Sequence, residues 1–276
     1  MDVDAVFPNL SALVQSETKQ TLNQHGVNGK PTNDDYWNLK SSCWAVLNDR
    51  IRGRGGPHQT LKTLDEFIRR LPSSTSTRKK KSIANKICSG SQGSQFLDTA
   101  VEAAWALHYW ENGIDTHLEE PLNTSNIKKN NADLVITLKG TKYWLDAISV
   151  KLSNSKFHVR TSQTPLSELM AGPSKESVLA ELAYRAKNKY REKFGEYVHS
   201  GLFKGDGIVI LLCVFKAEEV VLPVFDYSNL LPPPAPEGLF DDESSGLNLV
   251  IVHTLDAKAN GILYPHILAY WLPGVS

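Results

Sequence analysis

The sequence predicts an α/β protein in which a mixed central sheet is flanked by helices. Residues 96–112 carry apolar side chains every three or four positions, which predicts an amphipathic helix. Residues 132–138 and 143–152 are apolar stretches separated by a turn at Gly140, which predicts a hairpin. Residues 207–215 form a continuous apolar run, typical of a strand buried on both faces. Helices and strands therefore alternate in the middle of the chain.

The chain divides by composition into three sections. Residues 1–72 are expected to be mainly helical, because apolar residues recur at helical spacing near both ends of this section. Residues 73–95 are rich in Ser and Lys and are expected to form a basic linker. Residues 96–276 are expected to form the α/β domain, which ends in an extension of closing strands at 247–254 and 262–272.

The elements expected around the hairpin follow a definite order. They are a helix at 96–112, strands at 114–122, 132–138 and 143–152, a helix at 174–194 and a strand at 207–215. Gly113 and Gly195 follow the two helices, and glycine is the usual residue just beyond a helix C-terminus. Two histidines of the closing strands, His253 and His266, are expected to lie in the core.

Composition excludes several classes of protein. The 30 basic and 30 acidic residues balance, so a nucleic-acid surface must be a local patch. No stretch reaches the roughly 18 apolar residues of a membrane span, and the acidic N-terminus lacks the pattern of a signal peptide. The three cysteines are scattered and odd in number, which argues against a disulfide framework and a zinc site. We therefore expect a protein without membrane contact in the cytoplasm, or in the nucleus of a eukaryote.

The hairpin around Gly140 carries the residues with chemical potential. Asp133 lies in its first strand, and Lys151 lies near the end of its second. A lysine in an apolar strand requires a partner or solvent, and Asp133 is the partner that we expect. A carboxylate at a strand end can hold Mg²⁺, and a nearby lysine can stabilise charge that develops on a phosphate. A plain cross-strand ion pair of the two residues remains the alternative.

This order of helix, three strands, helix and strand, with Asp and Lys on neighbouring strands, resembles the PD-(D/E)XK, or restriction-endonuclease-like, superfamily. The resemblance covers residues 96–216. It implies a nuclease that uses Mg²⁺ (or Mn²⁺), with Asp133 as a metal ligand and Lys151 as the catalytic lysine. It also implies that Glu102, on the preceding helix, joins the metal site. Glu102 as an exposed helix residue is the alternative.

One position departs from the pattern of that superfamily. Its acidic-x-Lys motif appears in this chain as Ser149-Val150-Lys151, so that a serine stands where a carboxylate is expected. Asp146 is the nearest replacement, but it precedes Lys151 by five residues, and strict alternation puts the two on opposite faces. Only a β-bulge would bring Asp146 to the site, so a surface or structural role is the first expectation for it. Glu102 is the other candidate for the missing charge.

Basic residues near the predicted site are candidates for contact with nucleic acid. Arg185 and Lys189 share one side of the second helix, although a solvated helix face explains them equally well. The other candidates are His158 and Arg160, which follow the lysine-bearing strand, and Lys79 and Lys80 in the basic linker.

The resemblance implies a metal-dependent DNA endonuclease, with RNA left open as the substrate. It points to the effector of a restriction or anti-phage defence system. Because the chain shows no motor or target-reading module, a partner protein that supplies targeting or motor activity is expected, and a homo-oligomer is left open. The alternative is a catalytically inactive subunit that keeps the nuclease fold and binds nucleic acid or a partner protein.

Overall fold

A computed structural model describes residues 7–13, 57–73, 75–77, 79–80, 82–83, 94–122, 131–151, 175–195, 208–216 and 247–271. The chain divides into two compact units. The first contains Met1–Gly113 and Leu255–Pro265, and the second contains Ile114–Thr254 and His266–Ser276.

Helix α8 (Ser94–Glu111) of the first unit confirms the helix predicted at residues 96–112, and two more helices, α2 (Pro8–Leu13) and α6 (Pro57–Arg70), lie in the described part of the N-terminal section. The buried side of α6 consists of Thr63, Leu64, Phe67 and Ile68. Phe67 stacks on Trp110 of α8 with ring centroids 5.7 Å apart, so the two amphipathic helices share one apolar core.

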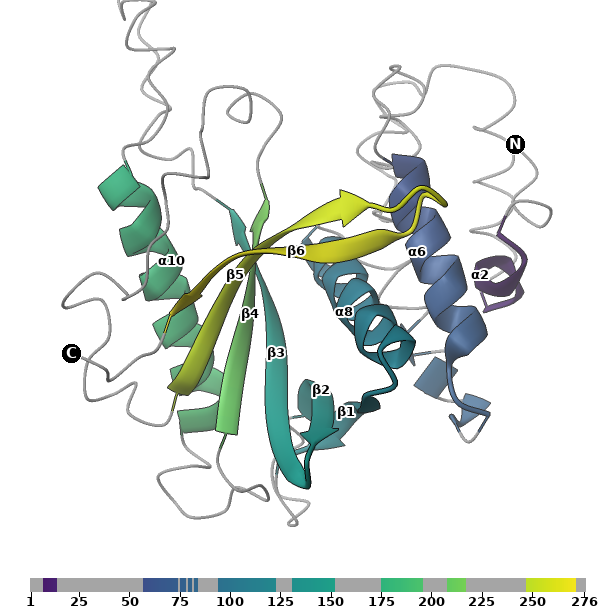
Figure 1. Ribbon diagram of the computed structural model, residues 1–276, viewed down its shortest axis with the longest axis horizontal. Helices are drawn as coiled ribbons and strands as arrows, with labels where there is room; N and C mark the ends of the chain where they lie inside the picture. The colour runs from purple at the N-terminus through teal and green to yellow at the C-terminus, as the bar shows by residue number, and fades with distance from the viewer. Residues whose placement is uncertain are drawn as a thin grey trace, which may run out of the picture. The chain divides into compact units, whose positions relative to one another are not determined.

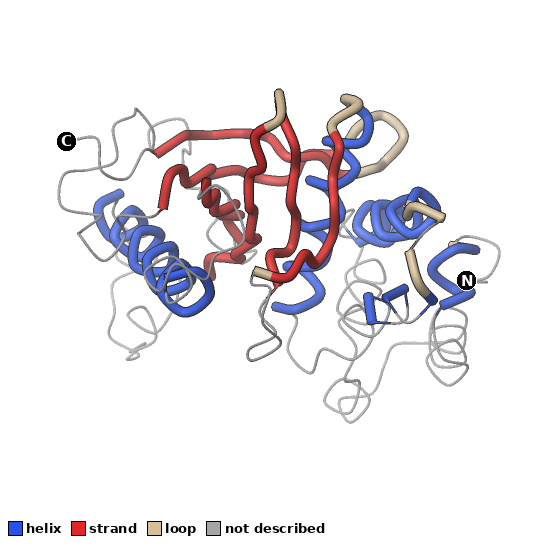
Figure 2. The backbone as a smooth tube through the Cα atoms, turned by 90° about the horizontal axis from the view of Figure 1, so that it is seen from below, coloured by secondary structure: helices blue, strands red, loops and turns tan. Residues whose placement is uncertain are grey.

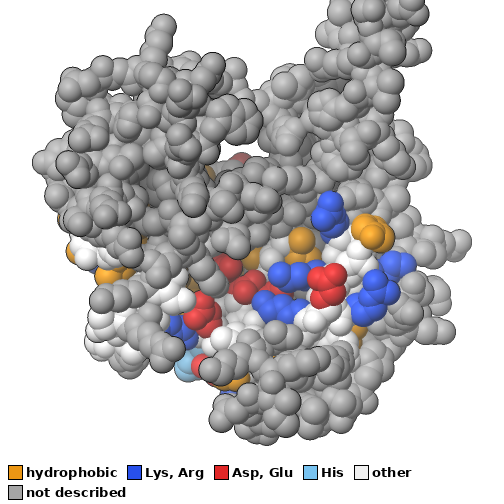
Figure 3. Space-filling model, turned by 180° about the vertical axis from the view of Figure 1, so that it is seen from behind, with side chains coloured by type: hydrophobic (Ala, Val, Ile, Leu, Met, Phe, Trp, Pro, Cys, Tyr) orange, Lys and Arg blue, Asp and Glu red, His pale blue; other side chains and the backbone are white. Residues whose placement is uncertain are grey.

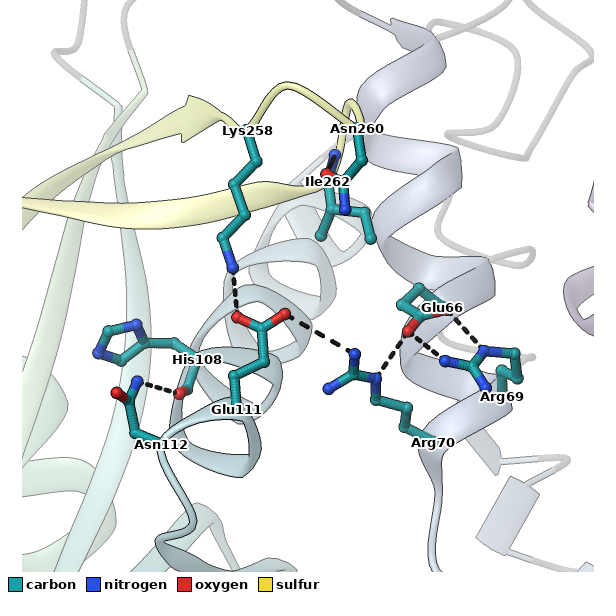
Figure 4. A network of polar contacts seen from close by, with 9 residues as sticks. All are labelled: Glu66, Arg69, Arg70, His108, Glu111, Asn112, Lys258, Asn260 and Ile262. Atoms are coloured by element: carbon teal, nitrogen blue, oxygen red, sulfur yellow. Dashed lines mark hydrogen bonds and ion pairs between the residues drawn. The ribbon is translucent and has the colours of Figure 1, made fainter.

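Polar contacts fix the ends of these helices. The carboxylate of Asp65 on α6 accepts hydrogen bonds from the backbone N–H groups of Asn9 and Leu10, at 2.9 and 2.8 Å. These donors lie in the first turn of α2, where no helical carbonyl can reach them. The side chain of Glu111 pairs with Lys258 and lies 3.8 Å from Arg70, as Figure 4 shows.

A six-stranded mixed sheet has its strands in sequence order. The strands are β1 (Asp115–Pro121), β2 (Asn131–Leu138), β3 (Thr141–Lys151), β4 (Ile208–Lys216), β5 (Leu247–Ala257) and β6 (Leu263–Trp271). β1, β2 and β3 pair antiparallel, whereas β4 runs parallel to both β3 and β5. The prediction that the apolar run at 207–215 joins the hairpin in one sheet is confirmed.

Helix α10 (Lys175–Tyr190) supplies the crossover that a parallel pair of strands requires. It packs against β3 and β4, and Figures 1 and 2 show it beside the strands. The chain then continues as one turn of π-helix, η2 (Arg191–Gly195). Ala183, Ala186, Tyr190 and Phe194 form the buried side of these two segments. The expected end of the helix at Gly195 is thus correct, whereas the π-helical turn was not predicted.

The β2–β3 turn has the backbone of a tight hairpin. Lys139 and Gly140 have φ angles of 49° and 82°, and Leu138 pairs with Thr141 across the turn. Positive φ at both central residues is the condition for the two-residue turn that matches the twist of the strands. The position of this turn fixes the register of the whole hairpin.

Two other parts of the chain carry sequence predictions, the basic linker and the closing strands. Within the predicted linker, Thr77, Lys79 and Lys80 have helical geometry, and the linker itself remains a prediction. Ile83 in the same segment is buried. Of the two strand histidines, His253 is buried as expected, but His266 is exposed. Within the part of the chain that the structure describes, no helix is long and apolar enough to span a membrane.

Candidate functional site

Two carboxylates face each other on the β2–β3 hairpin. The antiparallel ladder ends with the pair Leu134 and Leu145, so the next residues on the two strands are Asp133 and Asp146. The Oδ2 atom of Asp133 accepts a hydrogen bond of 2.9 Å from the backbone N–H of Ala147. Residues directly opposite in an antiparallel pair point to the same face of the sheet. The hairpin register therefore brings the two carboxylates together.

Two lysines reach these carboxylates from the helix that packs on the sheet. Nζ of Lys193, in η2, lies 3.1 Å from Oδ1 of Asp133 and also donates a hydrogen bond to Oδ1 of Asp146. Nζ of Lys189, in α10, lies 3.1 Å from Oδ2 of Asp146. The cluster of Asp133, Asp146, Lys189 and Lys193 thus combines two acidic and two basic side chains. We call it the Asp–Lys cluster.

The four side chains of the Asp–Lys cluster differ in how far they are exposed to solvent. The side chain of Asp146 is 0% exposed, those of Asp133 and Lys193 are 14% and 17% exposed, and that of Lys189 is 34% exposed. A buried charge is tolerated only when it is paired, so the two lysines are what allow both aspartates to lie here. Lys189 is thus the most exposed member of the cluster.

The two aspartates have opposite pKa shifts. Burial raises the pKa of Asp146 to about 7, the nearby Asp133 carboxylate acts in the same direction, and Lys193 and Lys189 only partly oppose them. For Asp133, burial also favours a higher pKa, but the attraction of Lys193 and the hydrogen bonds from Asp146 and the Ala147 N–H outweigh it and lower the pKa. Asp133 is therefore ionised at neutral pH, whereas Asp146 gains its proton close to neutrality.

The structure corrects the partner that was expected for Asp133. Lys151 lies five residues beyond Asp146 on a strand whose pairing with β4 is unbroken from Tyr143 to Lys151. At about 3.3 Å per residue, this separation is roughly 16 Å, too far for an ion pair between Asp133 and Lys151. Of the surface or structural role first expected for Asp146, the surface position is wrong, because its side chain is 0% exposed. Asp146 joins Asp133 through the hairpin register, and no bulge in β3 is needed.

The remaining candidate residues are dispersed. Ser149 and Lys151 pair through their backbones with Val214 and Lys216 of β4. Glu102 is half-buried on α8 in the first unit, and its role at a metal remains a prediction. Arg185 is exposed on α10.

The candidates in the loop and the basic linker lie elsewhere. Lys79 and Lys80 are half-buried in the first unit. His158 and Arg160 lie outside the described residues.

The sequence places Lys193 next after Arg185 and Lys189 on one side of the helix, but it does not predict the contact of Lys193 with the aspartates. The contact of both lysines with the hairpin depends on how α10 packs. The signal for Asp146 was stronger. Counting back from a turn centred on Lys139 and Gly140 leads directly to the opposition of Asp133 and Asp146.

The carboxylate oxygens of the Asp–Lys cluster are possible ligands of a metal ion. Among the described residues, no group of three or more His, Cys, Asp or Glu side chains is arranged to hold a metal ion. The two aspartates nevertheless direct carboxylate oxygens at one point, which the Lys193 ammonium group occupies. Mg²⁺ is often held by only one or two carboxylates and completed by waters and substrate phosphates. Asp133 and Asp146 therefore fit a hard cation as a pair.

Comparisons of the chain with protein-family models, with curated proteins and with solved structures found no match. The Asp–Lys cluster and its place in the fold are therefore the features that indicate a function.

Proposed function

We propose that the chain is a metal-dependent nuclease with a restriction-endonuclease-like core, and that the Asp–Lys cluster is its active site. The observation that carries this proposal is the convergence of the Asp133 and Asp146 carboxylates on the ammonium group of Lys193. The order of elements and the mixed sheet support the assignment of the core. The substrate that we propose is DNA, cut by hydrolysis of a phosphodiester bond.

A divalent cation, Mg²⁺ or Mn²⁺, would be held by Asp133 and Asp146. Bound there, it would supply the usual chemistry of such ions, the activation of water and the polarisation of a phosphoryl oxygen. The position of the Lys193 ammonium group supports this assignment, because it shows that the two carboxylates favour a cation between them.

The residues of the chain have separate tasks in this proposal. The N–H of Ala147 fixes the orientation of the Asp133 carboxylate, which stays ionised because its pKa is lowered despite its burial. Lys193 brings a positive charge to the place where negative charge develops on the phosphate, which is among the largest contributions to catalysis of this kind. Lys189 lies at the exposed side of the cluster and partly balances Asp146. Lys193 therefore takes the place that the sequence assigned to Lys151.

The second candidate function is a catalytically inactive subunit that keeps the nuclease fold and binds nucleic acid or a partner protein. The charge balance of the cluster favours this candidate. Two ammonium groups already pair with two carboxylates, so both buried charges have an ion-pair partner without a metal, although Oδ2 of Asp146 accepts no hydrogen bond.

Cleavage by a matched set of variants distinguishes the two candidates. Asp146→Asn keeps the shape of the side chain but removes a charged ligand, and we expect it to lower the Mg²⁺-dependent cleavage rate by roughly a hundredfold or more. Lys142→Ala is the control, because Lys142 is an exposed residue of the same strand. Circular dichroism checks that both variants fold. If the wild-type protein cuts no DNA with Mg²⁺ or Mn²⁺, alone or with its partner, the inactive subunit would be the remaining candidate function.

The biological setting belongs to the same proposal. Defence against foreign DNA, as in restriction or anti-phage systems, is the setting that the proposed core most readily suggests. A partner protein would then supply targeting or motor activity.

A further inference from the structure

We infer that the exposed side of α10 and η2 binds a single-stranded segment of nucleic acid, and that Tyr184 is the residue on which a base stacks. The inference deepens the proposed function, because it names the form of substrate that approaches the Asp–Lys cluster. It rests on that function only for its link to cleavage.

Helical geometry defines the surface. The buried side of α10 contains Ala183, Ala186 and Tyr190. At 3.6 residues per turn, Tyr184 lies on the same outward stripe as Asn188 and Arg191, away from the buried side. Tyr184 is 58% exposed, more than the other exposed large hydrophobic side chains of the described residues, Tyr270 at 49% and Leu138 at 37%.

The charge of this side is complementary to phosphate. Among the residues of this side whose exposure the structure describes, Arg185, Lys187 and Arg191 are exposed or half-buried, and the acidic Glu192 is exposed. The guanidinium group of Arg191 donates a 3.0 Å hydrogen bond to Oδ1 of Asn188, which orients it along the stripe. Figure 3 shows Lys and Arg side chains, drawn in blue, close to acidic side chains on the described surface. Positive charge on an exposed helix side favours a polyanion.

A second row of basic residues connects the surface with the cluster. Arg185, Lys189 and Lys193 follow one another at intervals of four residues, so they lie along one side of the helix. Arg185 is exposed, Lys189 is 34% exposed and Lys193 is 17% exposed, so the row runs from solvent toward Asp133 and Asp146. At 1.5 Å per residue, Tyr184 lies about 14 Å along the helix from Lys193, a span of a few nucleotides.

The exposed ring of Tyr184 decides between single and double strands. Stacking on an aromatic side chain requires a base whose face is open, as in a single strand. In a duplex each base face is covered by its neighbours, and a surface of this kind can then offer only phosphate contacts. The neighbouring arginine and lysine side chains would hold the backbone of the same strand.

Binding measured without metal tests this inference. The full chain, in EDTA, is titrated into fluorescein-labelled oligothymidine, oligouridine and a DNA duplex of equal length, and fluorescence anisotropy is followed. Tyr184→Ala is expected to weaken binding to the single strands roughly five- to hundredfold, the range for loss of one stacked base, and to leave duplex binding unchanged. Tyr184→Phe should keep the affinity. Tyr270→Ala, which removes the other exposed tyrosine, is the matched control. The DNA and RNA oligonucleotides show whether the 2′-hydroxyl matters.

Three results would overturn the inference. They are no binding by the wild-type chain, an equal loss on single strand and duplex in Tyr184→Ala, and the same loss in Tyr270→Ala. Failure of the proposed nuclease function looks different, because the chain would then bind single strands through Tyr184 but never cut them. Cleavage that proceeds while Tyr184→Ala binds normally would overturn the inference alone.

Discussion

At the scale of single residues, Lys193 is the most constrained side chain of the described site. It pairs with Asp133 and Asp146, and all three are largely buried. Removal of one member of a buried charge cluster leaves the others without compensation, which typically costs about 3–5 kcal/mol. Asp146 can take up a proton near neutral pH, which places the expected cost at the lower end of this range.

Lys193→Met should therefore lower the free energy of unfolding by about 3 kcal/mol at pH 8, where Asp146 is largely ionised. Mg²⁺ should recover more stability in this variant than in the wild type, because the cation can take the place of the ammonium group. Urea denaturation with and without Mg²⁺ measures both effects. Lys142→Met, which changes an exposed lysine of β3 outside the cluster, is the control. Equal stability of the variant and the wild type would contradict the buried pairing.

His253 and Asp146 should impose opposite pH dependences on stability. Burial lowers the pKa of His253 to about 4 from an ordinary 6.5, so its contribution to stability is lost as pH falls from 6.5 to 4. The pKa of Asp146 is raised from 3.8 to about 7, so its contribution is present at low pH and is lost as pH rises through this interval. In the wild type the two slopes partly cancel.

Single substitutions should separate these slopes. His253→Gln should leave a protein whose stability rises less, or falls more steeply, than that of the wild type as pH rises from 4 to 7, because the slope of His253 that opposes the slope of Asp146 is removed. Asp146→Asn should leave the reverse, a stability that rises between pH 4 and 6.5. Urea denaturation at half-unit pH steps gives both curves. Parallel curves for the two variants would contradict the assigned shifts.

At the scale of elements, the β2–β3 turn determines which residues meet. The turn and both strands could be predicted from the sequence. The position of the turn also determines that Asp133 lies opposite Asp146. Lys151 was expected to pair with Asp133 because it lies near the end of an apolar strand. Alternation along one strand tells which residues share a face, but only the register with its neighbour tells which residues meet.

Gly140 is the residue of the turn that a side chain should strain. A Cβ at this position would meet no atom within 4 Å, but the φ angle of 82° is rarely adopted by residues other than glycine. Gly140→Ala should therefore cost about 1 kcal/mol through backbone conformation alone. Lys139→Gly, at φ 49°, should be neutral or slightly stabilising. Urea denaturation compares the two, and a stabilised Gly140→Ala would contradict the turn geometry.

The π-helical turn shows what the sequence could not give. The helix and its end at Gly195 followed from periodicity, but a π-helical turn depends on tertiary packing. Here Tyr190 and Phe194 are both buried and stack with ring centroids 6.4 Å apart, which anchors the turn that carries Lys193. Such turns are frequent at functional sites, which agrees with the role proposed for Lys193.

At the scale of the whole molecule, each of the two compact units is built from two segments that are separate in the sequence. Composition did not predict this division. The first unit takes in the segment Leu255–Pro265 at the tip of the β5–β6 hairpin, far along the sequence from its helices. The backbone N–H of Leu263 donates a 2.8 Å hydrogen bond to Oγ1 of Thr63 on α6. Periodicity predicts each helix or strand separately. Contacts between residues that are far apart in the sequence depend on tertiary packing, which a local sequence pattern does not predict.

The first unit should depend on its apolar core far more than on its surface charges. Leu64→Ala removes a fully buried side chain of α6 and should cost about 2–5 kcal/mol. Glu111→Gln breaks ion pairs with Lys258 and Arg70 that are partly exposed, and it should cost less than about 1 kcal/mol. Thermal and urea denaturation check both values. A larger loss from Glu111→Gln than from Leu64→Ala would contradict this description of the unit.

The most direct test of the central claim compares two lysines in one assay. Single-turnover cleavage of DNA in Mg²⁺ is measured for the wild type, Lys193→Ala and Lys151→Ala, with circular dichroism to confirm folding. If the Asp–Lys cluster is the active site, Lys193→Ala should lose roughly a hundredfold or more in rate, while Lys151→Ala stays close to the wild type. Loss of cleavage in Lys151→Ala, with Lys193→Ala fully active, would contradict the account.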